Sequence, residues 1–248
     1  MKKILLIVGM CFALVSVVFG QGNDKLPPAK EIVENYFEAI GGKEKLKEAK
    51  TWILSGNMLM NKTLAPLKIY LKQKKARVEI SSFGQQMIVA TNGKTAWEVN
   101  PYRRDKLIVK KGNDQENELH FQKLVFPAQL IKTSVYSRLK VSQTVFDGKA
   151  AYKLAYNASG MIFNSEAYIF DKSSHLLLQH NVKGMTINLK NYQAHSNGMK
   201  IPQSIKPEAT KAQQAMLPMV FNKVQVGVAI ADQIFEVPKV DPPSQNDA

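Results

Sequence analysis

The four histidines are the first candidates for chemistry, because imidazole transfers protons near neutral pH and is a common metal ligand. They stand at His120, His175, His180 and His195. Only His175 and His180 are near each other, and two residues five apart on a strand point to opposite faces. The spacing therefore predicts neither a metal site nor a catalytic histidine pair.

Carboxylates are concentrated near the start of the chain, at Glu31, Glu34, Glu38, Glu44 and Glu48. A solvated helix face explains this spacing better than a pair of carboxylates working as acid and base. No G-x-S-x-G nucleophile motif, phosphate-binding glycine loop or dinucleotide fingerprint occurs. The sequence predicts a protein that is not an enzyme, with no catalytic residue, no metal and no cofactor. An envelope hydrolase is kept only as a third hypothesis.

The first 20 residues have the layout of a secretory signal. Lys2 and Lys3 precede an apolar stretch that ends in small residues before the polar Gln21. The only cysteine, Cys11, lies in the middle of that stretch, whereas a lipid-modified cysteine would stand at its end. We expect residues 1–20 to be removed and an unanchored protein to be exported to the periplasm, with secretion as the alternative. No later window has the roughly 18 unbroken apolar residues of a membrane helix.

The charge of the chain favours anionic partners. The formal net charge of +14 falls to +12 without residues 1–20, which hold two lysines and no acid. Such a balance suits lipid headgroups or acidic proteins, and nucleic acid is not expected for an exported protein without an arginine-rich tract. Without residues 1–20 the chain has no cysteine and can form no disulfide, so its stability has to come from the burial of apolar side chains. We expect a linker over 21–28, one domain over 29–239, a disordered tail over 240–248, and a monomer.

The elements that must position any site begin with a helix in "AKEIVENYFEAIGGKEKLKEA", where Ile32, Tyr36 and Ile40 recur at helical spacing. Gly41 and Gly42 end it, and a short second turn follows. From Thr51 the period changes to two, as in "TWILSGNMLM", "LKIYLKQ" and "RVEIS", which is typical of antiparallel strands with one apolar face.

Hairpin turns are indicated at Asn92-Gly93, Asp147-Gly148 and Asn197-Gly198. Residues 112–134 interrupt the strands as an inserted helix, or two short ones, with a kink at Pro127. The expected fold is mainly β, with about eleven antiparallel strands in either two stacked sheets or one strongly curved sheet.

Methionine is frequent after the signal, at Met58, Met60, Met87, Met161, Met185, Met199, Met216 and Met219. Unbranched thioether side chains adapt to irregular apolar surfaces. A curved sheet lined partly by methionine would suit a mobile acyl chain, although methionine also serves as filler in ordinary cores.

The stretch "QQMIVATNGKTAWEVNPYRRDKLIVK" resembles the LolA/LolB-like periplasmic lipoprotein-carrier superfamily, in an order of strand, Asn-Gly-Lys-Thr hairpin, tryptophan strand and Asn-Pro-Tyr. The segments "VFDGKAAYKLAYN", "YIFDKSSHLLLQ" and "DQIFEVPK", and the N-terminal "YFEAIGGKEKL", look like the outer-membrane lipoprotein-sorting members of that group. The resemblance implies an unclosed antiparallel half-barrel whose apolar interior, under a helical lid, takes up acyl chains.

On this resemblance, ligand-binding residues can be named. The strand candidates are Trp52, Leu54, Met58, Ile69, Leu71, Met87, Val89 and Trp97, and the lid candidates are Leu124, Val125, Phe126, Leu130 and Ile131. One feature departs from the family, whose soluble carrier uses an arginine on an early strand to hold the lid. The nearest counterpart, Arg77, does not align without adjustment.

The function predicted is a periplasmic binding or carrier protein for lipid or the acyl chains of lipoproteins, in transient contact with an anionic membrane surface. The alternative is a non-catalytic envelope regulatory or scaffold module that binds a partner protein through basic residues such as Lys72, Lys74 and Lys75.

Overall fold

The structure is a computed structural model that describes residues 25–60, 62–110, 128–156, 167–182, 185–195, 197–208 and 218–238. The chain begins with helices α1 (Ala29–Ala39) and α2 (Lys43–Glu48), as the sequence predicts. Gly41 and Gly42 separate them with φ angles of 107° and 106°, which glycine adopts without strain. The predicted signal, over 1–20, and tail, over 240–248, lie outside the described residues.

Thirteen strands form one sheet in the described part of the chain, two more than the sequence suggested. Their bounds are β1 Thr51–Met60, β2 Thr63–Lys72, β3 Lys75–Ser82, β4 Gln85–Thr91, β5 Ala96–Val99, β6 Leu107–Lys110, β7 Leu139–Phe146, β8 Lys149–Tyr156, β9 Ala167–Asp171, β10 Leu177–Val182, β11 Met185–Ala194, β12 Lys200–Glu208 and β13 Met219–Val226.

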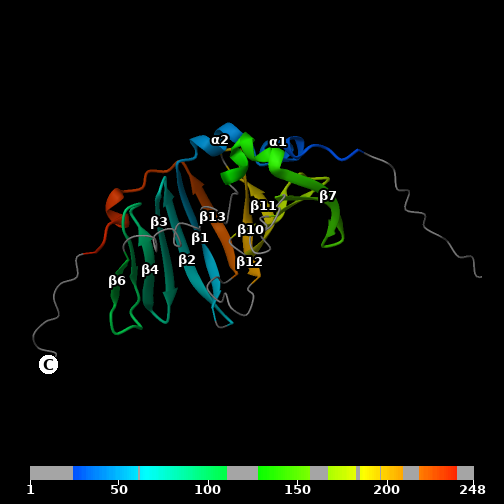
Figure 1. The fold of residues 1–248 in the computed structure, drawn as a ribbon. Helices are drawn as coiled ribbons and strands as arrows, with labels where there is room; N and C mark the ends of the chain where they lie inside the picture. Colours follow the sequence, from blue (N-terminus) through cyan, green and yellow to red (C-terminus); the bar gives the residue numbers. More distant parts are fainter. Residues whose placement is uncertain are drawn as a thin grey trace, which may run out of the picture.

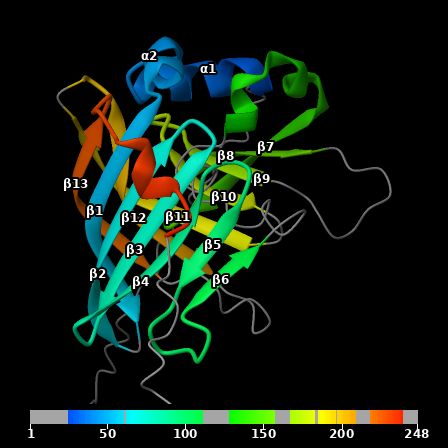
Figure 2. The same ribbon diagram turned by 90° about the vertical axis from the view of Figure 1, so that its left-hand side faces the viewer.

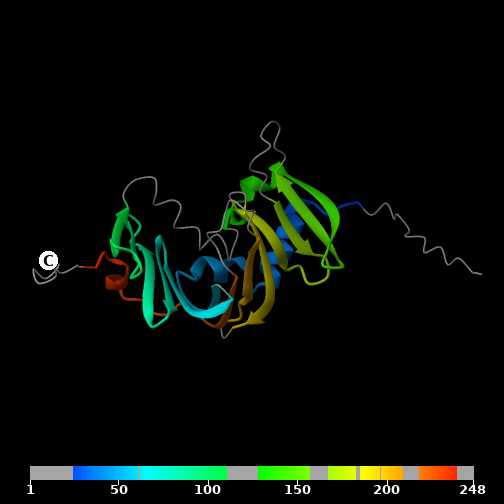
Figure 3. The ribbon, with the colours of Figure 1, turned by 90° about the horizontal axis from the view of Figure 1, so that it is seen from below.

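The sheet is antiparallel and unclosed. Its order is β6-β5-β4-β3-β2-β1-β13-β12-β11-β10-β9-β8-β7, so that β6 and β7 are its two edges (Figure 1). Seen from below, the sheet curves into a trough, with α1 and α2 across one end of its hollow side (Figure 3). The predicted mainly β half-barrel is confirmed.

We call the hollow side the inner face. It carries the apolar residues of each strand, and α1 packs on it with one buried stripe made by Ile32, Val33, Tyr36, Phe37 and Ile40. The Tyr36 ring lies 5.4 Å from that of Phe170 on β9. Burying each such side chain stabilises the fold by about 1.5–3 kcal/mol, which fixes α1 against the β7–β11 side of the trough.

The predicted inserted helix over 112–134 lies largely outside the described residues. Its described end forms two 3₁₀ helices, η2 (Ala128–Ile131) and η3 (Thr133–Arg138). Val135 and Tyr136 of η3 belong to the same buried cluster as α1, so these two turns complete the cover over that end of the inner face.

The join between the two halves of the sheet depends on Gly56. The pairing of β1 with β13 shifts between Ser55 and Gly56, where a β-bulge bends the strand. A Cβ atom on Gly56 would lie 2.0 Å from the carbonyl oxygen of Val220 on β13. Only glycine lets the two strands approach this closely.

The opposite, outer face is crossed by residues 228–238, which we call the C-terminal strap and which include η4 (Asp232–Phe235). Figure 2 shows η4, in red, in front of β3 and β4. Arg77 Nη1 donates to the Ile234 carbonyl at 2.8 Å, and Trp97 Nε1 donates to the Phe235 carbonyl at 3.1 Å. Trp97 and Phe235 are fully buried, so the strap covers a second, smaller core.

Candidate functional site

The inner face brings together seven of the eight strand residues predicted to bind ligand. Residues paired across antiparallel strands lie on one face, and the registers join β1, β2, β3 and β4 in this way. The residues that share the inner face are Trp52, Leu54, Met58, Ile69, Leu71, Met87 and Val89. The first five are buried, whereas Met87 and Val89 are half-buried.

Trp97 is the one that the structure separates from this group. It pairs with Ala90, which pairs with Arg77, and these three residues lie on the outer face. The Arg77 guanidinium lies 5.5 Å from the centre of the Trp97 ring. Trp97 therefore packs under the C-terminal strap and does not line the trough.

Of the predicted lid residues, only Leu130 and Ile131 lie within the described residues, whereas Leu124, Val125 and Phe126 lie outside them. Leu130 is fully buried, and its carbonyl accepts a 2.8 Å hydrogen bond from the Tyr136 hydroxyl. Ile131 packs against the same cluster, which also holds Trp52 and Leu54. These two residues thus share one apolar cluster with the strand candidates.

Arg77, the counterpart considered for a lid-holding arginine, points away from the lid side. Its Nε donates to Glu79 Oε1 at 2.7 Å and its Nη1 reaches the strap. Both contacts lie on the outer face, so Arg77 holds the strap.

Methionine side chains gather on the inner face toward the end farthest from α2. The described residues contain six methionines, of which five share that face by register: Met58, Met60, Met87, Met185 and Met219. Met219 and Met58 are opposite one another and buried, and the other three are half-buried. This end of the trough is therefore lined by side chains that repack readily.

The second half of the inner face was not identified from the sequence. Strands β9 to β13 contribute Tyr168, Phe170, Ile187, Leu189, Ile205 and Phe221, all buried. The period-two pattern in "TINLKN" and "MVFNKV" contains this signal. Which of its two faces is inner depends on the pairing with β1, which a single strand does not reveal.

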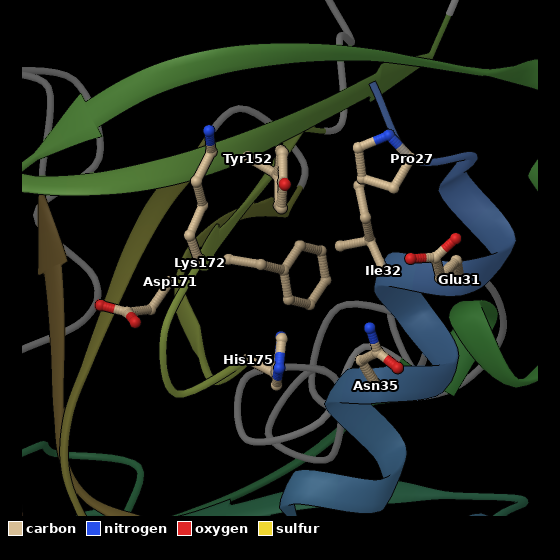
Figure 4. Close-up of a pocket in the computed structure, with 9 residues that line it drawn as sticks. Pro27, Glu31, Ile32, Asn35, Tyr152, Asp171, Lys172 and His175 are labelled. Atoms are coloured by element: carbon tan, nitrogen blue, oxygen red, sulfur yellow. The ribbon is translucent and has the colours of Figure 1, made fainter. Parts of the chain in front are cut away.

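Two hollows lie beside the second half of the sheet. The smaller, about 90 Å³, opens between α1 and the β9–β10 turn, among Glu31, Asn35, Tyr152 and His175 (Figure 4). At about 30 Å³ per water molecule it has room for about three waters and not for an acyl chain. The Lys172 ammonium lies over the Tyr152 ring at 4.7 Å from its centre.

The larger hollow, about 320 Å³, lies between the β7–β8 turn and strands β10 and β11. Leu176, Leu178 and Tyr192 give it an apolar lining, and the ion pair of Lys190 with Asp147, at 2.6 Å, stands at its rim. Its volume lies at the lower end of the range for small-molecule sites.

The polar groups buried near the inner face are few. The Tyr36 hydroxyl is buried with no hydrogen-bond partner among the described residues, and burial raises its pKa, which keeps it protonated. His180 is buried and its ring stacks on Tyr168 at 6.4 Å, whereas His175 lies in the β9–β10 turn. No group of His, Cys, Asp or Glu in the described ranges could hold a metal ion.

A different surface lies at the far end of the strands from α2, which we call the turn end. It comprises the β3–β4 and β5–β6 turns, which contain Phe83 and Tyr102, and the start of β2, which contains Leu64. These three residues, Leu64, Phe83 and Tyr102, are 64%, 90% and 54% exposed. The Tyr102 hydroxyl donates to the Ser82 carbonyl at 2.6 Å and so joins two of the turns. Arg103, Arg104 and Lys106 add exposed cations beside these apolar groups.

Two of the three lysines considered for partner binding, Lys72 and Lys75, have an internal partner. Asp232 in the strap binds Lys75 at 2.7 Å and Lys72 at 3.1 Å. These hydrogen bonds, and the positive charges, lower the pKa of Asp232. Reversing those lysines would therefore loosen the strap as well as change the surface charge.

No helix in the described parts of the chain is long and apolar enough to cross a membrane.

No known family model matches the chain, and no curated protein does. Among solved structures, it is similar to a LolA superfamily protein of Nitrosomonas europaea, at 12% identity over 86% of this chain and 99% of the other, with a TM-score of 0.46.

An outer membrane lipoprotein-sorting protein domain from Vibrio parahaemolyticus is similar at 11% identity over 83% of this chain and 95% of the other, with a TM-score of 0.43. MucB, in its complex with MucA from Pseudomonas aeruginosa, is similar at 12% identity over 85% of this chain and 61% of the other, with a TM-score of 0.30. Because all three TM-scores lie below 0.5, the function proposed below rests on the contacts of this chain itself.

Proposed function

We propose that this protein binds the acyl chains of a lipid or a lipoprotein on the inner face of its half-barrel. The observation that carries the proposal is the continuous apolar inner face, which α1, η2 and η3 cover at one end and methionines line toward the other. An amphiphile's chain could lie along it without any specific polar contact, since each buried methylene contributes about 0.8 kcal/mol.

The binding residues we assign are those of the inner face. They are Trp52, Leu54, Met58, Ile69, Leu71, Met87 and Val89, with Leu130 and Ile131 at the covered end and Leu124, Val125 and Phe126 as further lid candidates. Met87 and Val89 are only half-buried, so a ligand could contact them with the least disturbance of side chains that are already packed. Trp97 is not included because it lies on the outer face.

The location that fits this function is the periplasm, reached after removal of residues 1–20 and without retention of Cys11 as an anchor. A carrier of acyl chains has to meet membranes, and the turn end combines exposed apolar and cationic side chains that suit an anionic lipid surface. We assign the transient membrane contact to that end.

A matched pair of variants tests the binding face. Met87 and Ile88 are neighbours on β4, half-buried, on the inner and outer faces respectively. Met87→Gln replaces a thioether with an amide of similar length at the proposed site. The dissociation constant for a fluorescent 16-carbon fatty acid should rise about tenfold, the equivalent of 1.4 kcal/mol, because an amide would face the chain.

Ile88→Gln is the control and should bind the probe as the unchanged protein does. Thermal unfolding of both variants excludes a general loss of structure. If both variants bind the probe equally weakly, the experiment assigns binding to neither face. The proposal is refuted if the unchanged protein takes up neither the fatty acid nor a diacylated peptide.

A regulatory or scaffold role through Lys72, Lys74 and Lys75 is the competing function. The engagement of Lys72 and Lys75 with Asp232 argues against it, because these lysines already have a carboxylate partner inside the chain. Native mass spectrometry after purification from the native envelope separates the two roles: a stoichiometric bound lipid favours the carrier, and a copurified protein with no lipid favours the scaffold.

A further inference from the structure

Strand β7 is the longer of the two sheet edges and lacks the usual protection of an edge. It is eight residues long and pairs with β8 without a register shift, whereas the opposite edge, β6, has four residues. Natural edge strands avoid pairing with other chains through short length, proline, bulges or several charges. Residues 139–146 contain no proline, no bulge and a single charge, at Lys140.

The hydrogen-bonding groups of β7 that face away from β8 can be identified from its turn. Asp147 and Gly148 have φ angles of 47° and 76°, which make a two-residue type I′ hairpin. Phe146 and Lys149 therefore form a hydrogen-bonded pair, and alternate residues point their N–H and C=O groups outward. The outward residues are Leu139, Val141, Gln143 and Val145. The Leu139 N–H donates to the Tyr136 carbonyl of η3, and no other described residue outside β8 makes a backbone hydrogen bond to β7.

The side chains beside this edge show which partner would fit. Lys140, Lys149 and Lys153 lie on the outer face of the β7–β8 hairpin and are exposed, with no ion-pair partner among the described residues. The one carboxylate of the hairpin, Asp147, is paired with Lys190. On the inner face, Val145 is 71% exposed beside the half-buried Val141.

We propose that β7 accepts an extended acidic segment of a partner protein as a fourteenth strand. Its backbone would pair with the outward groups of β7. Its acidic side chains would then lie beside Lys140 on β7 and point toward Lys149 and Lys153 on β8, the next strand. Alternating apolar side chains would cover Val141 and Val145. This is strand addition to a sheet edge, in which main-chain pairing gives affinity and alternate side chains give specificity.

A second copy of this chain fits the same edge poorly. Antiparallel pairing of two β7 strands would place both sets of Lys140, Lys149 and Lys153 on one continuous face, where like charges oppose each other. The charge of the edge thus selects an acidic partner over self-association.

The test uses the full exported chain and a synthetic eight-residue peptide in which Glu alternates with Val, with a Lys–Val peptide of the same length for comparison. Amide hydrogen exchange should slow at least tenfold for Val141, Gln143 and Val145 when the Glu–Val peptide binds. No binding of this peptide, or protection at another strand, would overturn the proposal.

Gln143→Pro and Gln143→Ala form a matched pair, because only proline removes the outward N–H. Proline should weaken peptide binding at least tenfold, and alanine should leave it unchanged. A concentration-dependent dimer of the unchanged protein that disappears in Gln143→Pro would assign the edge to a second copy and would also overturn the proposal.

Charge exchange provides a second test that does not alter the backbone. The triple variant Lys140→Glu, Lys149→Glu, Lys153→Glu should reverse the preference and bind the Lys–Val peptide. The matched control, Lys200→Glu, Lys206→Glu, Lys223→Glu, changes three exposed lysines elsewhere and should keep the preference for Glu–Val. An unchanged preference in the first variant would contradict the role of the three lysines. Uptake of the fatty-acid probe should be unaffected in all these variants, which separates this edge from the inner face.

Discussion

At the residue scale, several polar side chains in the described part of the chain fix turns, among them Asn92, Asn100 and Asp171. Asp171 is the best example, since its Oδ1 accepts hydrogen bonds from Ser173 Oγ at 2.6 Å, Ser173 N at 2.9 Å and Ser174 N at 2.7 Å. Burial acts to raise the pKa of Asp171, but these hydrogen bonds together lower it to about 2 from 3.8.

The stability contributed by Asp171 should therefore depend on pH. Because the pKa is lower in the folded state, the stabilisation is complete above about pH 4 and is lost as the pH falls toward 2. Asp171→Asn should lower the free energy of unfolding by about 1–2 kcal/mol at pH 7, and by much less at pH 2.5. Urea unfolding at the two pH values measures this, and a constant difference would contradict the role of the charge.

The residues of the candidate site show which features could be predicted from the sequence alone. The period-two pattern on β1, β2 and β4 placed seven strand residues on one face, because side chains alternate strictly along a strand. Trp97 was predicted to share the inner face, but it lies on the outer face. The register of β4 with β5 sets its position, and Phe235, far along the chain, covers it. A pattern within one strand contains neither kind of information.

At the element scale, the β1–β13 join decides the shape of the trough. Gly56→Ala would push a methyl group into the Val220 carbonyl, so β1 and β13 would have to separate locally. We expect it to lower the free energy of unfolding by about 2–3 kcal/mol. Gly84→Ala is the comparison: its φ of 74° is unfavourable for alanine but open space surrounds it, so a loss of about 1 kcal/mol is expected. If urea unfolding shows that both variants lose the same free energy of unfolding, the close approach of β1 and β13 at Gly56 does not limit the stability of the sheet.

The helices and turns were predicted more completely than the strand count. Apolar spacing, Gly41-Gly42 and the Asn-Gly and Asp-Gly pairs are local signals, and they located α1 and the hairpins. The count of about eleven falls two short, although every pairing except β1 with β13 joins strands that are consecutive in the sequence. The edge strand β6 has only four residues, too few for a clear period of two.

At the scale of the whole molecule, three sets of residues have separate proposed roles: the assigned binding residues of the inner face, the β7 edge and the turn end. The turn end yields its own prediction. Replacing Phe83 and Tyr102 with serine together should weaken binding to vesicles of anionic phospholipid by at least fivefold, because both exposed rings would no longer enter the interface.

The control for the vesicle experiment is Val145→Ser, which removes an exposed apolar group from the β7 edge and should leave vesicle binding intact. Binding by the unchanged protein should also weaken with added salt, as the cations Arg103, Arg104 and Lys106 are screened. If neither the loss of the two rings nor added salt weakens vesicle binding, the membrane contact lies elsewhere on the protein.

The strand order also has a consequence in time. Strands β1 and β13 come from opposite ends of the sheet-forming sequence, and they meet in its middle, with Trp52 opposite Val226. During synthesis the two arms, β1 to β6 and β7 to β12, can form from neighbouring hairpins, but no strand pairing joins them until β13 has emerged. The central pairing of the sheet, and with it the trough, is therefore the last part of the sheet that the growing chain can complete.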